Sequence, residues 1–368
     1  MVQRHVEHGL GLARAKPFQA RGKGRIRLGH GIVQLPFAFN HTARVAERIA
    51  TLDLVSDGRV DFGTGEASSE AELGGFLVDR AQKRDQWAEA LDAVTRMFVE
   101  TPFAGYDGEF FQMPARNVVP KPFQKPHPPL WVACSRRETI HLAATKGIGA
   151  LSFSFIEPAE AKAWVDDYYA TLASTDCVPG GFAVNPAVAI VIPMMCHADE
   201  QTAIDRGLDG AHFFGYSLGH FYAFGQHRPG VTDVWQEFQA KRDLFGFKRE
   251  VAAQTDQPLG AQLYEKGLGA LRGAIGTPEQ LRGLLRGYEK AGVDQVIFVS
   301  QAGRNRHEDI CESLELFATE VMGEFVERDA AGAAARAERL APAIEAALAR
   351  RDPPRPVPDV VMNPAMAF

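Results

Sequence analysis

The stretch RIRLGHGIVQLPFAFNHTARVAERIATLDLVSDGRVDFGTG, residues 25–65, decides the fold. An apolar, β-branched run stops at Pro36, a helical pattern of apolar residues follows between Val45 and Leu52, and a second short apolar run ends at Gly65. This order predicts strand, helix and strand. Because the strands of such a unit are parallel, their polar or glycine-rich ends are expected on one rim, where a ligand can bind.

The same alternation continues through the rest of the chain. Apolar runs predict further strands at Leu130–Cys134, about Ala150–Phe155, Ala187–Cys196 and Gln295–Ser300. An amphipathic pattern predicts a helix at Arg80–Phe98, and a capping-box spacing at Ser135 and Glu138 predicts the start of the next one. Two more helices are predicted to carry a proline in the first turn, at positions 158 and 278, and two others to start near Glu200 and His307. Residues 66–75 are predicted as a loop, and a last helix is expected to be interrupted by Pro342.

Regular alternation over one chain favours an eight-stranded parallel (β/α)8 barrel over an open doubly wound sheet. Only one strand, ending near His8, fits before Arg25, so the barrel is expected to lack its first strand and helix or to have them in degenerate form. We predict a barrel domain over residues 1–327, with an aromatic and glycine-rich insertion, or lid, at 210–260. Residues 328–368 are predicted to form a helical and proline-rich extension that lies outside the core or docks on a partner.

Composition narrows the class of protein. The 368 residues are 46% hydrophobic, which is enough for a large core, and the net charge of −6 argues against nucleic acid or an anionic membrane as a partner. The four cysteines lack metal-binding spacing and are interpreted as reduced thiols in the cytoplasm, and no metal site is predicted. No apolar run reaches the roughly 20 residues that span a membrane, and the N-terminus is charged where a secretory signal is apolar.

Two strand ends carry residues suited to a phosphate or a flat ring. Gly63 and Gly65 would let backbone N–H groups approach a ligand, although an ordinary strand-to-helix turn is the simpler interpretation. Ser135 and Arg136 open a helix, so a hydroxyl, a helix N-terminus and a guanidinium together could bind a phosphomonoester. Alternatively, Ser135 caps the helix and the arginines are solvated.

Other polar residues give weaker signals. Gly303 and Arg304, after the last strand, could bind phosphate or form a simple turn. His8 and His30 lie at predicted strand ends and could move a proton, although a lone histidine is more often structural. The histidines of the insertion fit no metal motif and are predicted to be pocket or lid residues: His212, His220 and His227.

Motifs for other cofactors and nucleophiles are absent from the sequence: there is no P-loop, no GxGxxG after the first strand, no GxSxG and no HExxH. A cofactor held by backbone groups and a ring pocket fits this pattern better than a side-chain nucleophile. Five stretches together resemble the bacterial luciferase-like, flavin-dependent monooxygenases: RIRLGHGIVQLP, HTARVAERIATLDLVSDGRVDFGTG, PKPFQKPHPPLWVACSRRETIHLAATKGIGAL, IGTPEQLRGLLRGYEKAGVDQVIFVSQAG and HEDICESLELFATEVMGEF.

The resemblance covers residues 25–325 apart from the insertion. It implies a barrel that binds reduced FMN, supplied by a separate flavin reductase, and uses O₂ to oxygenate a small apolar organic substrate. By position, it implies a flavin site made by strand-tip residues: His30, Gly31, Ile32, Gly63, Gly65, Ala133, Ser135, Arg136, Thr139 and Leu151. Gly31 and Ile32 match the pair behind the flavin ring, and Ser135 matches the phosphate-binding serine.

The chain also departs from the family pattern. Glu66 stands where many relatives have an arginine, so Arg136 is expected to supply the positive charge, and Gly9 replaces the second histidine of a Glu-His-His motif that begins at Glu7. His8 matches the catalytic base of that motif. An F420-dependent oxidoreductase of the same superfamily and a degenerate, non-catalytic flavin-binding protein remain alternatives, and a homodimer is expected by resemblance.

Overall fold

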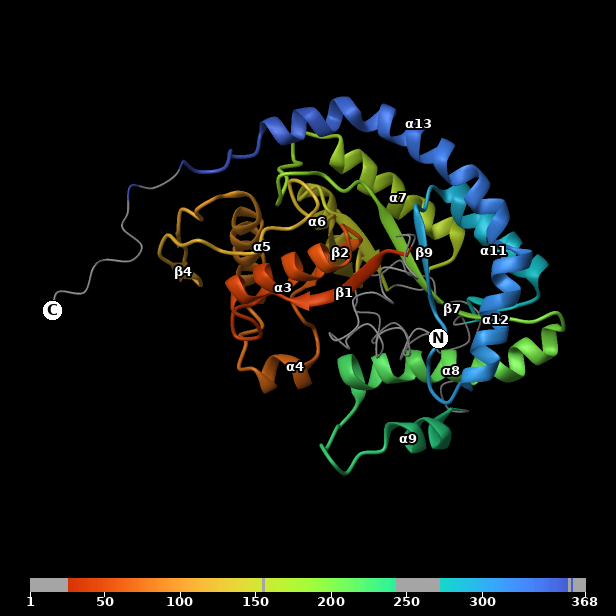
Figure 1. The fold of residues 1–368 in the computed structure, drawn as a ribbon. Coiled ribbons are helices and arrows are strands. Elements are labelled where there is room, and N and C mark those ends of the chain that lie inside the picture. Colours follow the sequence, from red (N-terminus) through yellow and green to blue (C-terminus); the bar gives the residue numbers. More distant parts are fainter. Residues whose placement is uncertain (1–25, 154–155, 243–271, 357–358, 360–368) are drawn as a thin grey trace.

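The computed structural model describes residues 26–153, 156–242, 272–356 and 359. In this part of the chain, seven parallel strands form one sheet that is curled into a half-barrel with helices around it (Figure 1). These strands are β1 (Leu28–Gln34), β2 (Val60–Gly65), β5 (Leu130–Cys134), β6 (Gly149–Ser152), β7 (Val188–Cys196), β8 (Ala274–Gly276) and β9 (Gln295–Val299). Their order is β1, β2, β5, β6, β7, and both β8 and β9 pair with β7.

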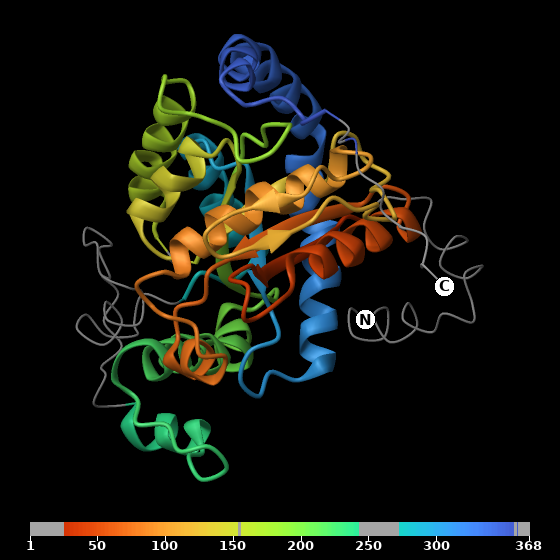
Figure 2. The same ribbon diagram turned by 90° about the vertical axis from the view of Figure 1, so that its left-hand side faces the viewer.

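The long strands alternate with helices, which confirms the predicted rhythm. The helices are α3 (Thr42–Val55), α4 (Glu70–Gly75), α5 (Lys83–Val99), α6 (Arg137–Thr145), α7 (Pro158–Leu172), α8 (Glu200–Gly219), the π-helix η1 (His220–Phe224), α9 (Val234–Lys241), α11 (Pro278–Ala291), α12 (His307–Glu320) and α13 (Met322–Ala349). Because all seven strands of the large sheet are parallel, their C-terminal ends form one rim. Figure 2 shows that α8 and α9 lie at one end of the molecule and α13 at the other.

Local signals set several helix ends. Thr277 accepts from the backbone N–H of Gln280 while the Gln280 side chain accepts from the backbone N–H of Thr277, which is a complete capping box ahead of α11. The same helix ends at Gly292, whose φ of 88° is the left-handed conformation that glycine adopts without strain. Pro158 occupies the first turn of α7 as predicted.

The main core lies between the outer face of the sheet and the helices. Phe62 of β2 is fully buried and packs edge-on against Phe98 of α5. On the same face of β2, the Thr64 hydroxyl accepts from the indole N–H of Trp87 at 3.1 Å. Alternation along β2 therefore directs Asp61, Gly63 and Gly65 to the concave, inner side of the half-barrel.

In the part of the chain that the structure describes, no strand joins β1 to β9. Within the described residues, each of these strands pairs on one side only, with β2 and β7 respectively. Leu28 and Ile32 of β1 are accordingly 38% and 39% exposed. β9 is only half-buried along this edge. The strand predicted to end near His8 lies outside the described residues.

Three predictions need correction. The segment 66–75, predicted as a loop, contains α4, and a short hairpin of β3 (Tyr106–Asp107) and β4 (Gln112–Met113) follows α5. The first ten residues of the predicted insertion continue α8 to Gly219. Pro342 does not interrupt α13. Most of α13 is exposed, so water can hydrate the carbonyl group that Pro342 leaves without a donor.

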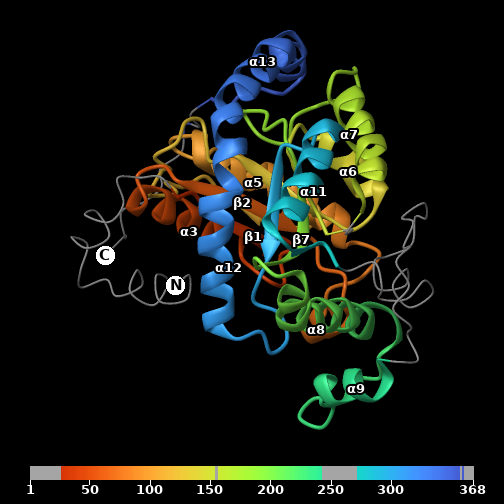
Figure 3. The same cartoon turned by 90° about the vertical axis from the view of Figure 1, so that its right-hand side faces the viewer.

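The C-terminal segment is mostly exposed, although Leu340 and Ala347 of α13 are buried in the main core, and it is attached to its own chain. Figure 3 shows α12 running along the barrel and continuing into α13, which bends over its end. Beyond α13, Arg351 pairs with Asp92 of α5 at 2.5 Å and Arg355 pairs with the buried Glu100 at 3.3 Å. No helix of the described residues is long and apolar enough to cross a membrane.

Candidate active site at the strand tips

The structure brings the predicted residues of β2, β5 and β6 to neighbouring positions on one rim, whereas His30 and Gly31, predicted at a strand end, lie in the middle of β1, which runs on to Gln34. β1, β2, β5 and β6 are adjacent and parallel, and the pairing sets Gln34 opposite Gly65 and Ala133 opposite Leu151. The register of β1 shifts between His30 and Val33, so a bulge is formed at Gly31 and Ile32. His8 lies outside the described residues, so its predicted role is a matter for experiment.

The two glycines of β2 are needed by the chain itself. A Cβ atom on Gly63 would lie 2.2 Å from the carbonyl oxygens of His30 and Gly31, and one on Gly65 would lie 2.6 Å from a methyl group of Ile32. Both glycines therefore allow the bulged part of β1 to lie close against β2. By contrast, nothing lies within 4 Å of the corresponding position on Gly31, which leaves open space beside the bulge.

The concave wall next to the bulge is apolar and built from small or flat side chains. Trp131, Leu151 and Ala189 pack together there, with Ile297 of β9 at the far side. The Trp131 indole N–H reaches the carboxylate of Asp61 at 3.4 Å. A planar ligand could lie against such a wall at the level of Ala133 and Leu151.

The N-terminus of α6 is a candidate anion site. The predicted capping box at Ser135 is wrong, because Arg136 is the N-cap residue and no side chain caps the helix. Its N-terminal N–H groups and the positive end of its dipole therefore favour an anion, and the hydroxyls of Ser135 and the buried Thr139 lie in this turn. Among the described residues, Arg136 makes no ion pair, so its charge is available.

Sequence reasoning missed a second basic group beside α6. Lys83 and Arg84 begin α5 and pair with Glu66 at 3.1 and 3.4 Å, and Arg84 also pairs with Glu138 in the first turn of α6. Glu66 is thus neutralised within the chain, which removes the expected repulsion of a phosphate. Burial lowers the pKa of Lys83, as do the positive charges of Arg84 and Arg136.

One sequence signal could have identified this group. Basic residues in the first turn of a helix oppose the helix dipole and are unfavourable unless an anion or acid lies nearby. The chain also turns sharply at Ala67, whose φ of 61° is unusual for a residue with a side chain, and the Ala67 carbonyl accepts from Lys83 at 2.7 Å. The contact between Glu66 and Lys83 is non-local, so it could not be derived from either residue alone.

The aromatic part of α8 and α9 covers the rim near β7 and β9. Tyr216 and Phe238 are buried against Val191, and Phe213 and Trp235 pack beside them. No group of three or more potential metal ligands occurs in the described residues, which include the histidines at 212, 220 and 227.

The weaker prediction of a phosphate site at Gly303 and Arg304 is not supported. The Arg304 guanidinium stacks on the Trp235 ring at 4.8 Å, and a Cβ atom on Gly303 would lie 2.9 Å from that ring. Gly303 also has a φ of 55°. These residues hold α9 against the loop after β9 and do not form an anion cradle.

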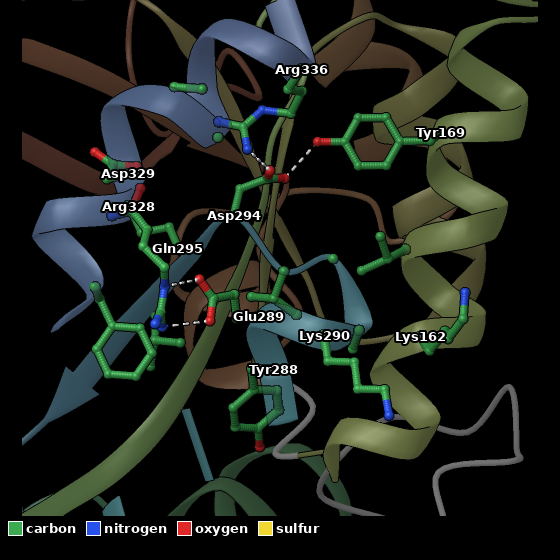
Figure 4. A pocket seen from close by; sticks show the side chains of 18 of the residues that line it. Lys162, Tyr169, Tyr288, Glu289, Lys290, Asp294, Gln295, Arg328, Asp329 and Arg336 are labelled. Atoms are coloured by element: carbon green, nitrogen blue, oxygen red, sulfur yellow. Dashed lines mark hydrogen bonds and ion pairs between the residues drawn. The ribbon is translucent and has the colours of Figure 1, made fainter. Parts of the chain in front are cut away.

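A large cavity of about 1090 Å³ lies elsewhere, between α7, α11, the start of β9 and α13 (Figure 4). None of the predicted strand-tip residues lines it. On its wall, the Asp294 carboxylate accepts from the Tyr169 hydroxyl at 2.6 Å and the Val188 N–H at 2.7 Å, and pairs with Arg336 at 2.6 Å. Figure 4 shows Arg336 and Tyr169 converging on Asp294 from opposite helices. This cavity is at the strand starts and is distinct from the rim.

Comparison with curated proteins gives partial matches. The chain is 33% identical over 126 residues to the uncharacterised protein y4wF of Sinorhizobium fredii, covering 33% of this chain and 35% of that protein. It is 29% identical over 124 residues to the oxygenase component of the flavin-dependent trigonelline monooxygenase of Acinetobacter baylyi, covering 33% of each chain. The matched region spans about a third of the length of these relatives.

Solved structures share the fold. The chain superposes on the monooxygenase RslO1 of Streptomyces bottropensis with a TM-score of 0.60 at 21% identity, covering 82% of this chain and 79% of that one. The superposition on an F420-dependent secondary alcohol dehydrogenase has a TM-score of 0.56 at 14% identity, and it covers 82% of this chain and 80% of that one. The superposition on the FMN-bound oxygenating component of 3,6-diketocamphane monooxygenase from Pseudomonas putida has a TM-score of 0.57 at 16% identity, and it covers 81% of this chain and 79% of that one.

A family model also matches more than half of the chain. The model described as luciferase-like monooxygenase matches residues 24–295, which include every strand from β1 to β8 and the start of β9. With the parallel half-barrel and the structural neighbours, this match establishes that the chain belongs to the luciferase-like monooxygenase family.

Proposed function

We propose that the protein is an oxygenase that uses reduced FMN and O₂ to oxygenate a small apolar organic substrate. The observation that carries this proposal is the juxtaposition, on one rim, of an uncapped helix N-terminus beside Arg136 and a flat apolar wall at Ala133 and Leu151. A phosphorylated planar ligand needs both features. The family membership and the flavin-dependent relative support the same interpretation.

The residues present fit FMN. In the proposal, Ser135, Arg136, Thr139 and the N–H groups of α6 hold the phosphate, and Lys83 and Arg84 neutralise Glu66 beside it. The ring lies against the wall and the bulge of β1, where the space beside Gly31 is open. Bound reduced FMN would supply the electrons that activate O₂. The aromatic residues of α8 and α9 would exclude water from the rim, which favours oxygenation over loss of peroxide.

The proposal extends to partners and assembly. One curated relative is named as an oxygenase component, and this supports a separate flavin reductase as the source of reduced FMN. We further propose a cytoplasmic homodimer. Light scattering of the purified protein would test the dimer, and a monomer at micromolar concentration would contradict it.

Two other functions deserve a test. F420, which also carries phosphate on a planar ring system, is the cofactor of one structural neighbour, so an F420-dependent oxidoreductase is the second candidate. A non-catalytic flavin-binding protein is the third, because the unpaired edges of β1 and β9 leave the barrel open in the described residues.

Anaerobic titration with reduced FMN, riboflavin and reduced F420 tests the proposal. We expect tight binding of FMN, and we expect Arg136→Ala to weaken it about 10- to 100-fold, the effect of losing one charge-assisted hydrogen bond, without changing the affinity for riboflavin. Arg137→Ala is the matched control, since Arg137 points to Asp167 at 3.6 Å. Failure of both FMN and F420 to bind would refute a flavin-type site. Oxygen consumption that depends on reduced FMN separates the first candidate from the other two.

A further inference from the structure

A second group of polar side chains lies in the lid, away from the proposed phosphate site. The buried imidazole of His220, in the π-helix η1, contacts the Glu237 carboxylate of α9 through Nδ1 at 3.1 Å. On its other side, His220 Nε2 lies 3.3 Å from Nδ1 of the exposed His227. The three side chains therefore form a continuous chain from a carboxylate through a buried imidazole to an exposed one. Single-turn π-helices such as η1 frequently occur at functional sites.

The surroundings hold this chain in place. A Cβ atom on Gly225 would lie 2.4 Å from the His220 ring, so glycine is required for the ring to sit against the backbone. Glu237 also pairs with Lys241 on α9, and the Tyr216 hydroxyl of α8 bonds to the same carboxylate. Burial lowers the pKa of His220, while Glu237 opposes this and His227 and Lys241 reinforce it. His220 is therefore neutral near pH 7.

Proton positions follow from these contacts. The His220 ring and the Glu237 carboxylate are not aligned for an ideal hydrogen bond. A bare Nδ1 lone pair 3.1 Å from a carboxylate oxygen would be repelled, however, so Nδ1 carries the proton. In neutral His220, Nε2 is then an acceptor, and His227 must donate to it from Nδ1. This leaves the lone pair of His227 at Nε2, on the exposed side of the ring, free to accept a proton.

The chain lies on the side of the molecule where β1 and β2 end. η1 packs against α4, which follows β2. Burial and the negative charge of Glu72 on α4 raise the pKa of the Tyr222 hydroxyl. Glu72 in turn accepts from Gln34 at the end of β1 at 3.4 Å. The ring of Phe221 lies 5.0 Å from that of His227, so the accepting nitrogen belongs to an aromatic surface.

We propose that His227 Nε2 is a general base for an aromatic substrate that bears an acidic hydroxyl, with His220 and Glu237 as positioning residues. The O–H bond breaks, the proton moves to Nε2 and the electron pair remains on the oxygen. A phenolate is a more electron-rich target for oxygenation than a phenol. This inference rests on the proposed function of the rim and names the class of substrate it would take.

The first test reads proton positions directly and needs no activity. In ¹⁵N-histidine-labelled protein at pH 8, we expect the His227 nitrogen shifts to show Nδ1 protonated and Nε2 bare, the less common tautomer of a free imidazole. Glu237→Gln is expected to reverse the tautomer, while His307→Gln, a change of another exposed histidine, leaves it unaltered. Protonated Nε2 in the unaltered protein at this pH would overturn the proposal.

The second test uses 4-nitrophenol, whose absorbance reports its ionisation, with the anaerobic protein loaded with reduced FMN. We expect the unaltered protein to bind it as the phenolate at a pH where the free probe is largely protonated. His227→Gln is expected to reduce the phenolate signal at least about tenfold, because the glutamine side chain cannot take up the proton. An unchanged signal, or no phenolate with the unaltered protein, would overturn the proposal. Retained FMN affinity in the same variant separates this failure from a failure of the proposed function.

Discussion

His127, a buried histidine in the proline-rich segment before β5, should make the stability of the protein depend on pH. Its Nε2 accepts from the Phe182 N–H at 2.8 Å and its Nδ1 donates to the Pro128 carbonyl at 2.8 Å. The side chain is 4% exposed. A second proton on Nε2 would break the first of these bonds and place a charge in the core.

The magnitude follows from the pKa. Burial lowers the pKa of His127 to about 4, and the nearby positive charge of Arg351 adds to this effect. The unfolded chain takes up the proton first, near its ordinary value of about 6.5. The contribution of neutral His127 to the free energy of unfolding is therefore fully present above about pH 6.5, falls as the pH drops toward 4, and is lost in full below pH 4. The difference corresponds to about 3 kcal/mol, of which about 2.5 kcal/mol is lost by pH 4.5.

Urea unfolding at pH 7.5 and 4.5 measures this contribution against His127→Gln. Glutamine can still accept from the Phe182 N–H, so the variant should lose about 1 to 2 kcal/mol at pH 7.5 for the missing bond to Pro128. At pH 4.5 it should be at least as stable as the unaltered protein, because it has no proton to take up. The free energies of unfolding should therefore cross between these pH values. His307→Gln is the control, and parallel pH dependence of the unaltered protein and His127→Gln would refute the reasoning.

Three further predictions concern stability. Asp294→Ala should lower the free energy of unfolding in urea by about 3 to 5 kcal/mol, because Arg336, Tyr169 and the Val188 N–H lose their partner. Tyr169→Phe should lower it by about 1.5 to 3 kcal/mol. Equal, small losses in the two variants would contradict a stabilising role of the Asp294 contacts. Gly63→Ala should destabilise the protein by about 1 to 3 kcal/mol because the added methyl meets two backbone carbonyls, while Gly31→Ala, with nothing within 4 Å, should change stability by less than about 0.5 kcal/mol. Arg351→Ala should speed amide exchange in the last turn of α13 and the residues after it, more at low salt than at high salt, because it frees that segment from Asp92; protection that stays unchanged would argue against this anchor.

Much of the fold could be predicted because its signals are local. Leu130–Cys134 and Val188–Cys196 are short apolar runs, as expected of strands buried on both faces. Thr277, Pro278 and Gln280 start a helix by contacts within one turn. Where local signals conflicted, the sequence misled. Ser135 has the right spacing for a cap, yet the chain enters α6 one residue later.

The candidate site was predictable in position but not in charge. Parallel strands bring their ends together whatever their side chains, so the rim followed from the βα alternation alone. The neutralisation of Glu66 by Lys83 and Arg84 depends on how α5 packs beside the tip of β2, which no pattern within either segment specifies. The Glu237–His220–His227 chain likewise joins two helices across an intervening turn.

The ion pairs of the C-terminal segment have a mechanical consequence for the open barrel. α12 and α13 start beside β9, and Arg351 and Arg355 end on α5, which packs beside β2 near the opposite margin of the sheet. Side-chain charges thus link the two margins of the sheet at the strand starts, which no backbone ladder joins in the described residues. Loss of these ion pairs should let the two margins of the sheet move apart. The curvature of the sheet at the rim therefore depends in part on arginines at the opposite end of the strands.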